Sequence, residues 1–214
     1  MPLSGEPGPD CGLCPRLAAF RTANRAAWPG WFNAPVPGFG PRTAPLLLVG
    51  LAPGLKGANR TGRPFTGDHA GILLYATLRA AGLADGVYGA DAGDGLALRD
   101  CRIVNAVRCV PPENKPLPAE IAACRPFLAA ELAAMPNLRA ILALGRIAHE
   151  AVLRAHGLAL RAHPFAHGAE HALPGGRRLF ESFHVSRYNT ATRRLTEEMF
   201  RAVITRLCTY LSAG

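Results

Sequence analysis

The sequence predicts an α/β fold, a single three-layer domain in which a four-stranded parallel sheet lies between helices on both faces. Three observations lead to this prediction. Short, almost uninterrupted apolar runs such as 46–51 and 138–144 are typical of strands that are buried on both faces of a sheet. Segments with apolar residues at helical spacing alternate with these runs, as strand–helix–strand units require. The length of 214 residues, 49% of them hydrophobic, suits one domain with a full core.

The predicted elements follow in order along the chain. Residues 1–10 are rich in Gly and Pro, and we expect a disordered N-terminal tail there, with the domain occupying residues 11–214. Prolines break residues 28–45 into a loop, whereas residues 82–99 show no pattern that can be assigned. We expect strands at 46–51, 102–107, 138–144 and 178–184, and helices at 16–27, 72–81, 119–135, 147–156 and 195–211.

The chain carries a formal net charge of +9, which comes mostly from arginine. Such a surplus favours a polyanionic partner such as nucleic acid, although a composition rich in alanine and arginine would raise the charge without one. No apolar run approaches the roughly 20 residues that a membrane span requires, and the N-terminus lacks the pattern of a signal peptide. We therefore expect a cytoplasmic, nucleoid-associated monomer with no membrane partner.

Six cysteines in a reducing compartment need an explanation other than disulfides. Cys11 and Cys14 form a C-x2-C pair, and Cys109 and Cys124 flank a proline-rich turn. Four thiolates that converge from two turns can hold a tetrahedral metal ion or an iron–sulfur cluster. The spacing does not separate zinc from [4Fe–4S], and Cys109 and Cys124 would equally suit the core as ordinary buried residues. The other two cysteines fall in a predicted strand and a predicted helix, where packing explains them.

The stretch 50–71, between the first predicted strand and the next helix, holds more glycine than a simple connection requires. Glycine allows the backbone to approach a ligand closely. The carboxyl end of a parallel strand is also where open α/β sheets bind ligands. Within this stretch, Phe65 offers an apolar face and Asp68 a carboxylate. The sequence thus predicts a pocket here, with a long surface loop as the alternative.

Four stretches of the chain together resemble one family. They read GLAPG at 50–54, GANRTGRPFTGD at 57–68, NAVRC at 105–109 and HVSRYNT at 184–190. In this order they are similar to motifs of the iron–sulfur-containing uracil-DNA glycosylases, in particular the type-5 or B branch, over roughly residues 11–211. The resemblance implies a monofunctional DNA repair enzyme. It would flip uracil, and in this branch also hypoxanthine or xanthine, out of DNA and hydrolyse the N-glycosidic bond, leaving an abasic site.

The same resemblance implies the cofactor and three catalytic residues. A [4Fe–4S] cluster would be held by Cys11, Cys14, Cys109 and Cys124. Asp68 would activate water, although it would equally serve as the cap of the helix predicted to start near residue 72. Asn105 would pair with the O4 and N3–H edge of uracil, because an amide both donates and accepts. His184 would donate to uracil O2 and stabilise the departing anion.

The resemblance also implies a base-binding set of Leu51, Ala52, Phe65 and Asn105. Phe65 would stack on the base, although a core aromatic would have the same sequence pattern. Related branches carry a polar residue for positioning water near the start of the first motif, where this chain has Leu51 and Ala52. The absence of a bulky polar side chain there leaves a roomier pocket, which suits deaminated purines.

A DNA-binding role falls on the segment after the fourth strand. The residues concerned are Ser186, Arg187, Tyr188, Asn189 and Arg193. Ser186 would bond phosphate, and Arg187 or Tyr188 would press into the gap left by the flipped nucleotide. Arg193 would attract phosphate without sequence preference. A solvated, arginine-rich turn is the alternative.

The sequence disfavours two other interpretations. His163, His167 and His171 recur every four residues, but Pro164 and Gly168 interrupt the helix that would gather them, so no zinc site is expected from these three. A nucleotide-using enzyme is disfavoured because the glycine loop lacks the G-x4-G-K-[ST] pattern. A non-catalytic nucleic-acid-binding protein with a four-cysteine metal or iron–sulfur site remains the alternative to the enzyme.

Overall fold

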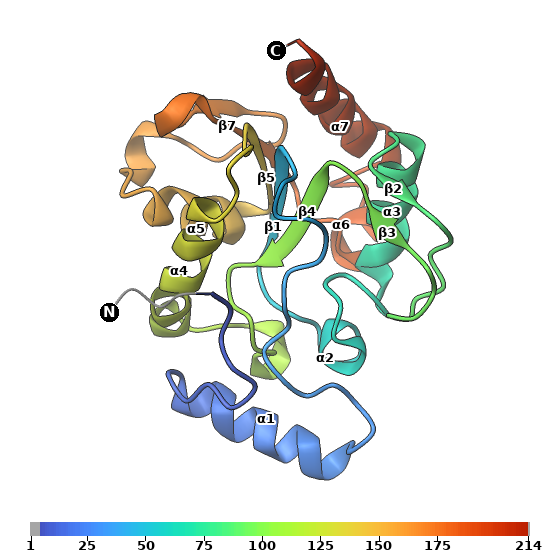
Figure 1. The fold of residues 1–214 in the computed structure, drawn as a ribbon, viewed down its shortest axis with the longest axis vertical. Helices are drawn as coiled ribbons and strands as arrows, with labels where there is room; N and C mark the ends of the chain where they lie inside the picture. Colours follow the sequence, from blue (N-terminus) through green and yellow to red (C-terminus); the bar gives the residue numbers. More distant parts are fainter. Residues whose placement is uncertain (1–4, 214) are drawn as a thin grey trace.

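A five-stranded sheet forms the centre of the molecule, with strand order β4–β1–β5–β7–β6 (Figure 1). The computed structural model describes residues 5–213. Four strands run parallel, namely β1 (Leu46–Gly50), β4 (Cys101–Asn105), β5 (Ala140–Leu144) and β7 (Arg178–Ser182). The fifth strand, β6 (Glu170–Ala172), pairs antiparallel with β7. The predicted four-stranded parallel sheet is therefore corrected to a mixed sheet of five strands. The edge strand was missed because its three residues, Glu-His-Ala, contain no apolar run.

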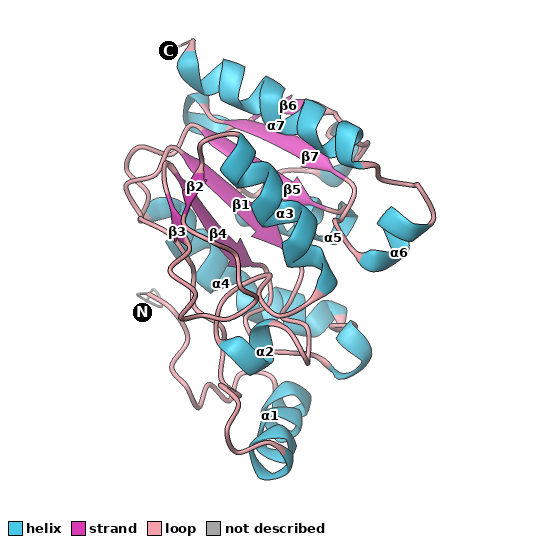
Figure 2. Ribbon diagram, turned by 90° about the vertical axis from the view of Figure 1, so that its right-hand side faces the viewer, coloured by secondary structure: helices cyan, strands magenta, loops and turns pink. Residues whose placement is uncertain are grey.

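Helices cover both faces of this sheet and make the three-layer arrangement (Figure 2). Helices α3 and α7 pack on one face through a core that includes Leu74 and Phe200, and α4 and α5 pack on the other through Leu128 and Val152. The helices are α1 (Pro15–Ala27), α2 (Ala58–Thr61), α3 (His69–Ala80), α4 (Pro118–Ala133), α5 (Arg146–Ala155), α6 (Arg187–Ala191) and α7 (Glu197–Ser212). Among the described residues, no helix is both long and apolar enough to cross a membrane.

Short elements occupy the stretches that the sequence pattern left open. Residues 82–99 contain β2 (Ala84–Asp85) and β3 (Ala97–Leu98), which pair antiparallel. Single turns of 3₁₀-helix occur at Pro112–Asn114, Leu160–Ala162 and Pro174–Gly176. These elements are too short to produce a hydrophobic period.

Part of the expected N-terminal tail is held against the domain. Residues 1–4 lie outside the described residues, but Glu6 accepts a hydrogen bond from the Gly38 amide at 2.6 Å and lies 3.2 Å from the Arg102 guanidinium. Asp10 pairs with Arg25 of α1 at 2.6 Å. Polar contacts that composition does not reveal therefore place residues 5–10.

At their carboxyl ends, β1 and β4 lead into irregular segments, at 51–57 and 106–111. Gly50 and Asn105 are paired in register at the ends of β1 and β4. The chain leaves β1 through α3 to reach β4 on one side, and returns through α4 to β5 on the other side of β1. Such a switch point opens a crevice beyond the carboxyl ends of the strands, where open α/β sheets bind ligands.

Candidate active site

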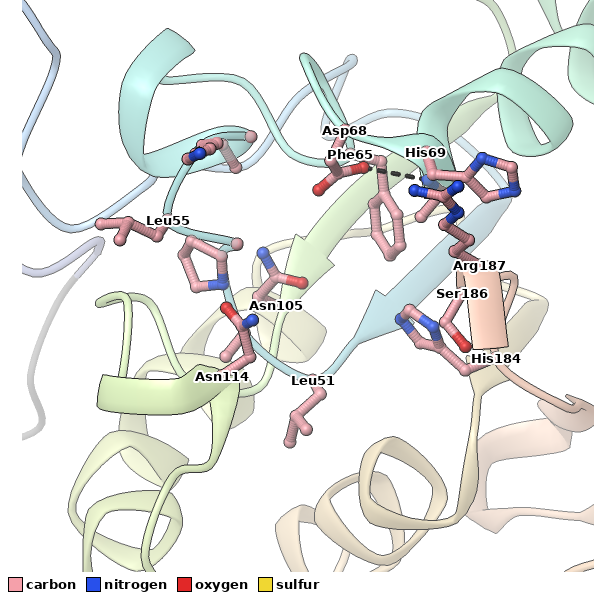
Figure 3. A pocket seen from close by; sticks show the side chains of 17 residues that line it. Leu51, Leu55, Phe65, Asp68, His69, Asn105, Asn114, His184, Ser186 and Arg187 are labelled. Carbon is pink, nitrogen blue, oxygen red and sulfur yellow. Dashed lines mark hydrogen bonds between the residues drawn. The ribbon is translucent and has the colours of Figure 1, made fainter. Parts of the chain in front are cut away.

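A cavity of about 630 Å³ lies at this edge (Figure 3). Its wall comes from the segments that follow β1, β4 and β7, so residues distant in sequence meet there. Of the side chains predicted to act on a base or to bind DNA, the wall includes Leu51, Ala52, Phe65, Asp68, Asn105, His184, Ser186 and Arg187. The volume is in the range of small-molecule sites.

Asp68 lies at the N-terminus of α3, and backbone amides of that helix hold its side chain. Its Oδ1 accepts hydrogen bonds from the amides of Ala70 at 3.1 Å and Gly71 at 3.4 Å, so the residue is the N-cap. Its Oδ2 faces the glycine loop, where a Cβ added to Gly57 would stand 2.3 Å away. Burial raises the pKa of Asp68, and the two amide hydrogen bonds only partly offset this effect. Capping thus orients the carboxylate and leaves one oxygen directed at the glycine loop that lines the cavity.

Asn105 ends β4 and is only 3% exposed. Its Oδ1 makes no hydrogen bond to any residue that the structure describes. A Cβ on Gly50 would lie 2.4 Å from this oxygen and 2.6 Å from Cζ of Phe65, so only glycine fits beneath the two side chains. A buried acceptor left unpaired costs roughly 1–3 kcal/mol, a cost that a ligand donor in the cavity would remove.

Phe65 adopts a backbone conformation that is uncommon for a bulky residue, with φ of +52°. Its ring centroid lies 5.9 Å from that of His184, at an interplanar angle of 31°. The close passage of α3 past its carbonyl requires Gly71, because a Cβ there would stand 1.9 Å from the Phe65 oxygen. Backbone strain of this kind persists where the surroundings fix it, and it concentrates at ligand sites.

His184 follows β7 by two residues and lines the cavity opposite Asp68 and Asn105 (Figure 3). Burial lowers the pKa of His184 to about 4. The ring is therefore neutral near pH 7 and can donate one hydrogen bond to a ligand without bringing a positive charge. The side-chain amide of Asn189 donates to the His184 carbonyl at 2.8 Å and fixes the backbone at this point.

The segment after His184 forms a short helix, α6, that was not predicted. Ser186 is its N-cap and accepts from the Asn189 amide at 3.4 Å. Arg187 is exposed and borders the cavity, and Tyr188 is 70% exposed. Arg193 is exposed as well, with φ of +56°. Of the five residues predicted to meet DNA, Ser186 and Asn189 thus make internal hydrogen bonds, whereas Arg187, Tyr188 and Arg193 face solvent.

Three further residues on the cavity wall were missed in the sequence, namely Lys56, His69 and Asn114. Asn114 ends the 3₁₀ turn in the proline-rich segment after β4 and has φ of +57°. A polar residue that follows a predicted strand at the ligand-binding edge is the signal that could have identified it. His69 Nε2 lies 3.1 Å from Thr190 Oγ1 and connects the start of α3 to α6.

The four predicted metal-ligating cysteines converge around a second, small cavity between α1, α4 and the segment after β4. It is lined in part by Cys11, Cys14, Cys109 and Cys124. The amide of Arg108 donates to Cys124 Sγ at 3.4 Å, and the Arg21 guanidinium donates to Cys109 Sγ at 3.5 Å. Burial raises the pKa of both the Cys109 and the Cys124 thiol to about 11. Cys101 and Cys208 belong instead to the core around α3 and α7.

The fold and cavity define a class: an α/β protein with a cavity, lined by polar side chains and an aromatic ring, at the carboxyl edge of its sheet. Residues 37–208 match the model of the uracil DNA glycosylase superfamily, and the chain belongs to that superfamily. It is 51% identical over 199 residues to a type-5 uracil-DNA glycosylase of Thermus thermophilus, covering 91% of this chain and 90% of the relative.

Other relatives carry the same description. The chain is 44% identical over 198 residues to a type-5 uracil-DNA glycosylase of Mycobacterium bovis, with 88% of this chain and 74% of the relative covered. It is 39% identical over 202 residues to one from Pyrobaculum aerophilum, with 92% and 87% covered. Type-4 relatives match a smaller part of the chain, as in the 38% identity with the Thermotoga maritima protein over 104 residues.

Proposed function

We propose that this protein is a DNA repair glycosylase that hydrolyses the N-glycosidic bond of uracil in DNA and leaves an abasic site. The observation that carries this conclusion is the convergence of Asp68, Asn105 and His184, from three distant segments, around one cavity of suitable size. The proposal includes a monomer that acts on the nucleoid DNA of the cell, with deaminated bases as the ligands.

Each side chain has a role that follows from its geometry. The flipped base stacks on Phe65, and the unpaired Oδ1 of Asn105 accepts from its N3–H. Neutral His184 donates to the base oxygen O2, on which negative charge develops as the bond breaks. Asp68, with Oδ1 held by the helix amides, uses Oδ2 to orient and deprotonate the attacking water.

The same pocket suits deaminated purines as well as uracil. Leu51 and Ala52 place only small or flexible apolar groups at the wall where a bulky polar side chain would limit the space. We include hypoxanthine and xanthine among the bases that the pocket accepts. Around the cavity mouth, Ser186, Arg187, Tyr188 and Arg193 contact the DNA backbone and the gap left by the base, with Asn189 supporting them from within.

The four cysteines would hold a [4Fe–4S] cluster. A tetrahedral zinc ion would keep its four sulfurs about 3.8 Å apart, as follows from a Zn–S bond of about 2.3 Å. Among the described residues, the cysteine sulfurs do not form a group of three or more within 4.8 Å of one another, and a polynuclear cluster holds its sulfurs farther apart. Amide and guanidinium donors to Cys124 and Cys109 fit thiolates that carry the negative charge of such a cluster. When bound, the cluster would cross-link α1, α4 and the segment after β4. We assign it this structural role and not a redox role because hydrolysis needs no electron.

The decisive experiment measures release of free uracil from an oligonucleotide by the wild-type protein and by Asp68→Asn and Asp68→Ala variants. Asn caps helices as well as Asp does, so Asp68→Asn should keep the wild-type melting temperature while the rate falls about 10²-fold or more. Asp68→Ala should lose the same activity and also about 1 kcal/mol of stability. Release of base by Asp68→Asn at the wild-type rate would contradict the assignment. Tight binding of uracil-containing DNA without release by the wild-type protein would favour the non-catalytic alternative.

A further inference from the structure

A group of three titratable side chains lies between α5, β6 and β7, and none of them lines the glycosylase cavity. Each comes from a different element: His149 from α5, His171 from β6 and Glu181 from β7. Nδ1 of His149 is 2.5 Å from Oε1 of Glu181, and Nε2 of His171 is 3.0 Å from the same oxygen. His149 and Glu181 are fully buried, and His171 is largely so.

Hydrogen bonding does not explain this arrangement. Although the three atoms are close, neither nitrogen nor Oε1 makes a hydrogen bond of acceptable geometry with the residues that the structure describes. The other carboxylate oxygen, Oε2, is already held by the Ala166 amide at 2.8 Å. The neighbouring cations Arg178 and Arg206 pair with Glu170 rather than with Glu181. Two ring nitrogens and one carboxylate oxygen thus face one another in a buried space without a hydrogen bond of acceptable geometry, at the high cost that unpaired buried polar groups carry.

We propose that His149, His171 and Glu181 form a binding site for a divalent transition-metal ion, for which zinc is the best match. Two imidazoles and one carboxylate are a donor set that zinc uses in proteins. Zinc would hold these donors about 3.3 Å apart, given bonds of about 2.0–2.2 Å, which requires only a small separation of atoms that already lie within 4.8 Å of one another.

A further donor stands beside the group. The ring centroid of His163 lies 5.4 Å from that of His171. Its Nδ1 lies 3.1 Å from the Ala159 carbonyl, which can only accept, so Nδ1 is the donor there and Nε2 is the nitrogen available to a metal ion. A hydrogen bond that fixes the tautomer in this way is the usual support of a metal-binding histidine. The helical set of His163, His167 and His171 remains excluded, since His171 is on a strand and the other two are in turns.

The site has a structural purpose. The short strand β6 pairs with β7 through three residues only, and a metal ion would tie it to both β7 and α5 (Figure 2). Glu181 precedes His184 by three residues, so the same ion would steady the strand from which His184 extends into the cavity. Nothing in this role depends on the chemistry of base release.

The test measures metal content in the full chain with its iron–sulfur absorbance intact, expressed in zinc-supplemented medium. We expect one zinc per chain, counted separately from iron, with an X-ray absorption shell of nitrogen and oxygen near 2.0 Å. His171→Gln should lose this zinc. His156→Gln, which changes a histidine at the end of α5 outside the group, should retain it. No zinc in the wild type, a sulfur shell near 2.3 Å, or zinc retained by His171→Gln would overturn the proposal.

A second measurement covers the case in which His171→Gln does not fold. Wild-type protein is treated with a chelator until zinc is removed while its iron absorbance persists, and zinc is then added back. Zinc in about 100-fold excess over its dissociation constant should raise the melting temperature by about 5–10 °C. An unchanged melting temperature would overturn the proposal. Uracil release is not used as a readout, so this result and the test of Asp68 stand independently.

Discussion

At the scale of single residues, Asn105 has the features of a side chain that recognises a ligand. Its buried Oδ1 lacks a partner among the described residues, so removing the amide costs the fold little. We expect Asn105→Ala to keep or slightly raise the melting temperature while kcat/KM for uracil release falls about 10–100-fold. Asn59 provides the matched control, because its buried amide donates to Asn33 Oδ1 at 2.9 Å. Asn59→Ala should lose about 1–3 kcal/mol of stability. A large loss of stability in Asn105→Ala would instead indicate a structural residue.

The acidic limb of the pH–rate profile should belong to Asp68 and not to His184. Burial raises the pKa of Asp68, and its carboxylate must be ionised to take a proton from water, so the rate falls as pH drops through that raised pKa. Burial lowers the pKa of His184 to about 4, so the ring does not titrate near pH 6–7, where a free imidazole would. The profile of kcat/KM should therefore have a single acidic limb, set above the usual aspartate range, that disappears from the residual activity of Asp68→Asn. A limb that persists in this variant would assign the titration to another group.

The sequence predicted which residues line the cavity better than it predicted their conformations and contacts. The sequence motifs pointed to Asp68, Asn105 and His184, and the structure places all three around one cavity. The strained backbone of Phe65 was invisible, because φ of +52° depends on the packing around it. The hydrogen bond from Asn189 to the His184 carbonyl could not be predicted either, because the sequence of this segment does not determine which side chains face inward.

At the scale of elements, the long buried runs were reliable and their ends were not. Each of the four parallel strands was predicted, but those expected to reach residues 51, 107 and 184 end earlier. The apolar pattern continues past the point where the backbone leaves the sheet, because the residues there still face the interior or the cavity. Helix α3 begins at His69 and not at residue 72, since Asp68 caps it from inside the glycine loop. The three-residue strand β6 and the five-residue helix α6 are too short and too polar to show a hydrophobic period.

The cysteine-lined region offers a prediction at the same scale. Cys109→Ser should lose iron, the brown colour and most of its soluble yield, because one ligand of the cross-link between α1, α4 and the segment after β4 is gone. Cys208 lies on α7, away from this region, and Cys208→Ser should keep iron and colour. Iron content and visible absorbance of the purified variants distinguish them. Equal iron in both variants would contradict the assignment of Cys109 as a ligand.

At the scale of the whole molecule, the candidate active site lies at one end of the sheet, and the strands and helices hold its segments in place. Helices on both faces bury the parallel strands, and the segments that follow β1, β4 and β7 meet at the carboxyl ends, where the cavity lies. The cysteine-lined cavity adjoins the segment after Asn105, whereas Glu181, of the group with His149 and His171, lies on the strand that leads to His184. The proposed cluster and the proposed metal ion would each support a different segment of the cavity wall.

We expect DNA binding to depend on where the positive charges lie and not only on the net charge of +9. Arg187 is exposed at the cavity mouth, where the phosphates next to a flipped nucleotide must pass. Each phosphate contact contributes a slope of about −0.9 to log K against log salt concentration for duplex DNA, so Arg187→Ala should weaken binding and make the slope shallower by about 1. Arg99 removes the same charge from a different place, since it precedes the amino end of β4 and pairs there with Asp85. Arg99→Ala should therefore leave the slope unchanged in a fluorescence anisotropy titration at several salt concentrations, whereas equal changes in both variants would mean that net charge alone draws DNA to this protein.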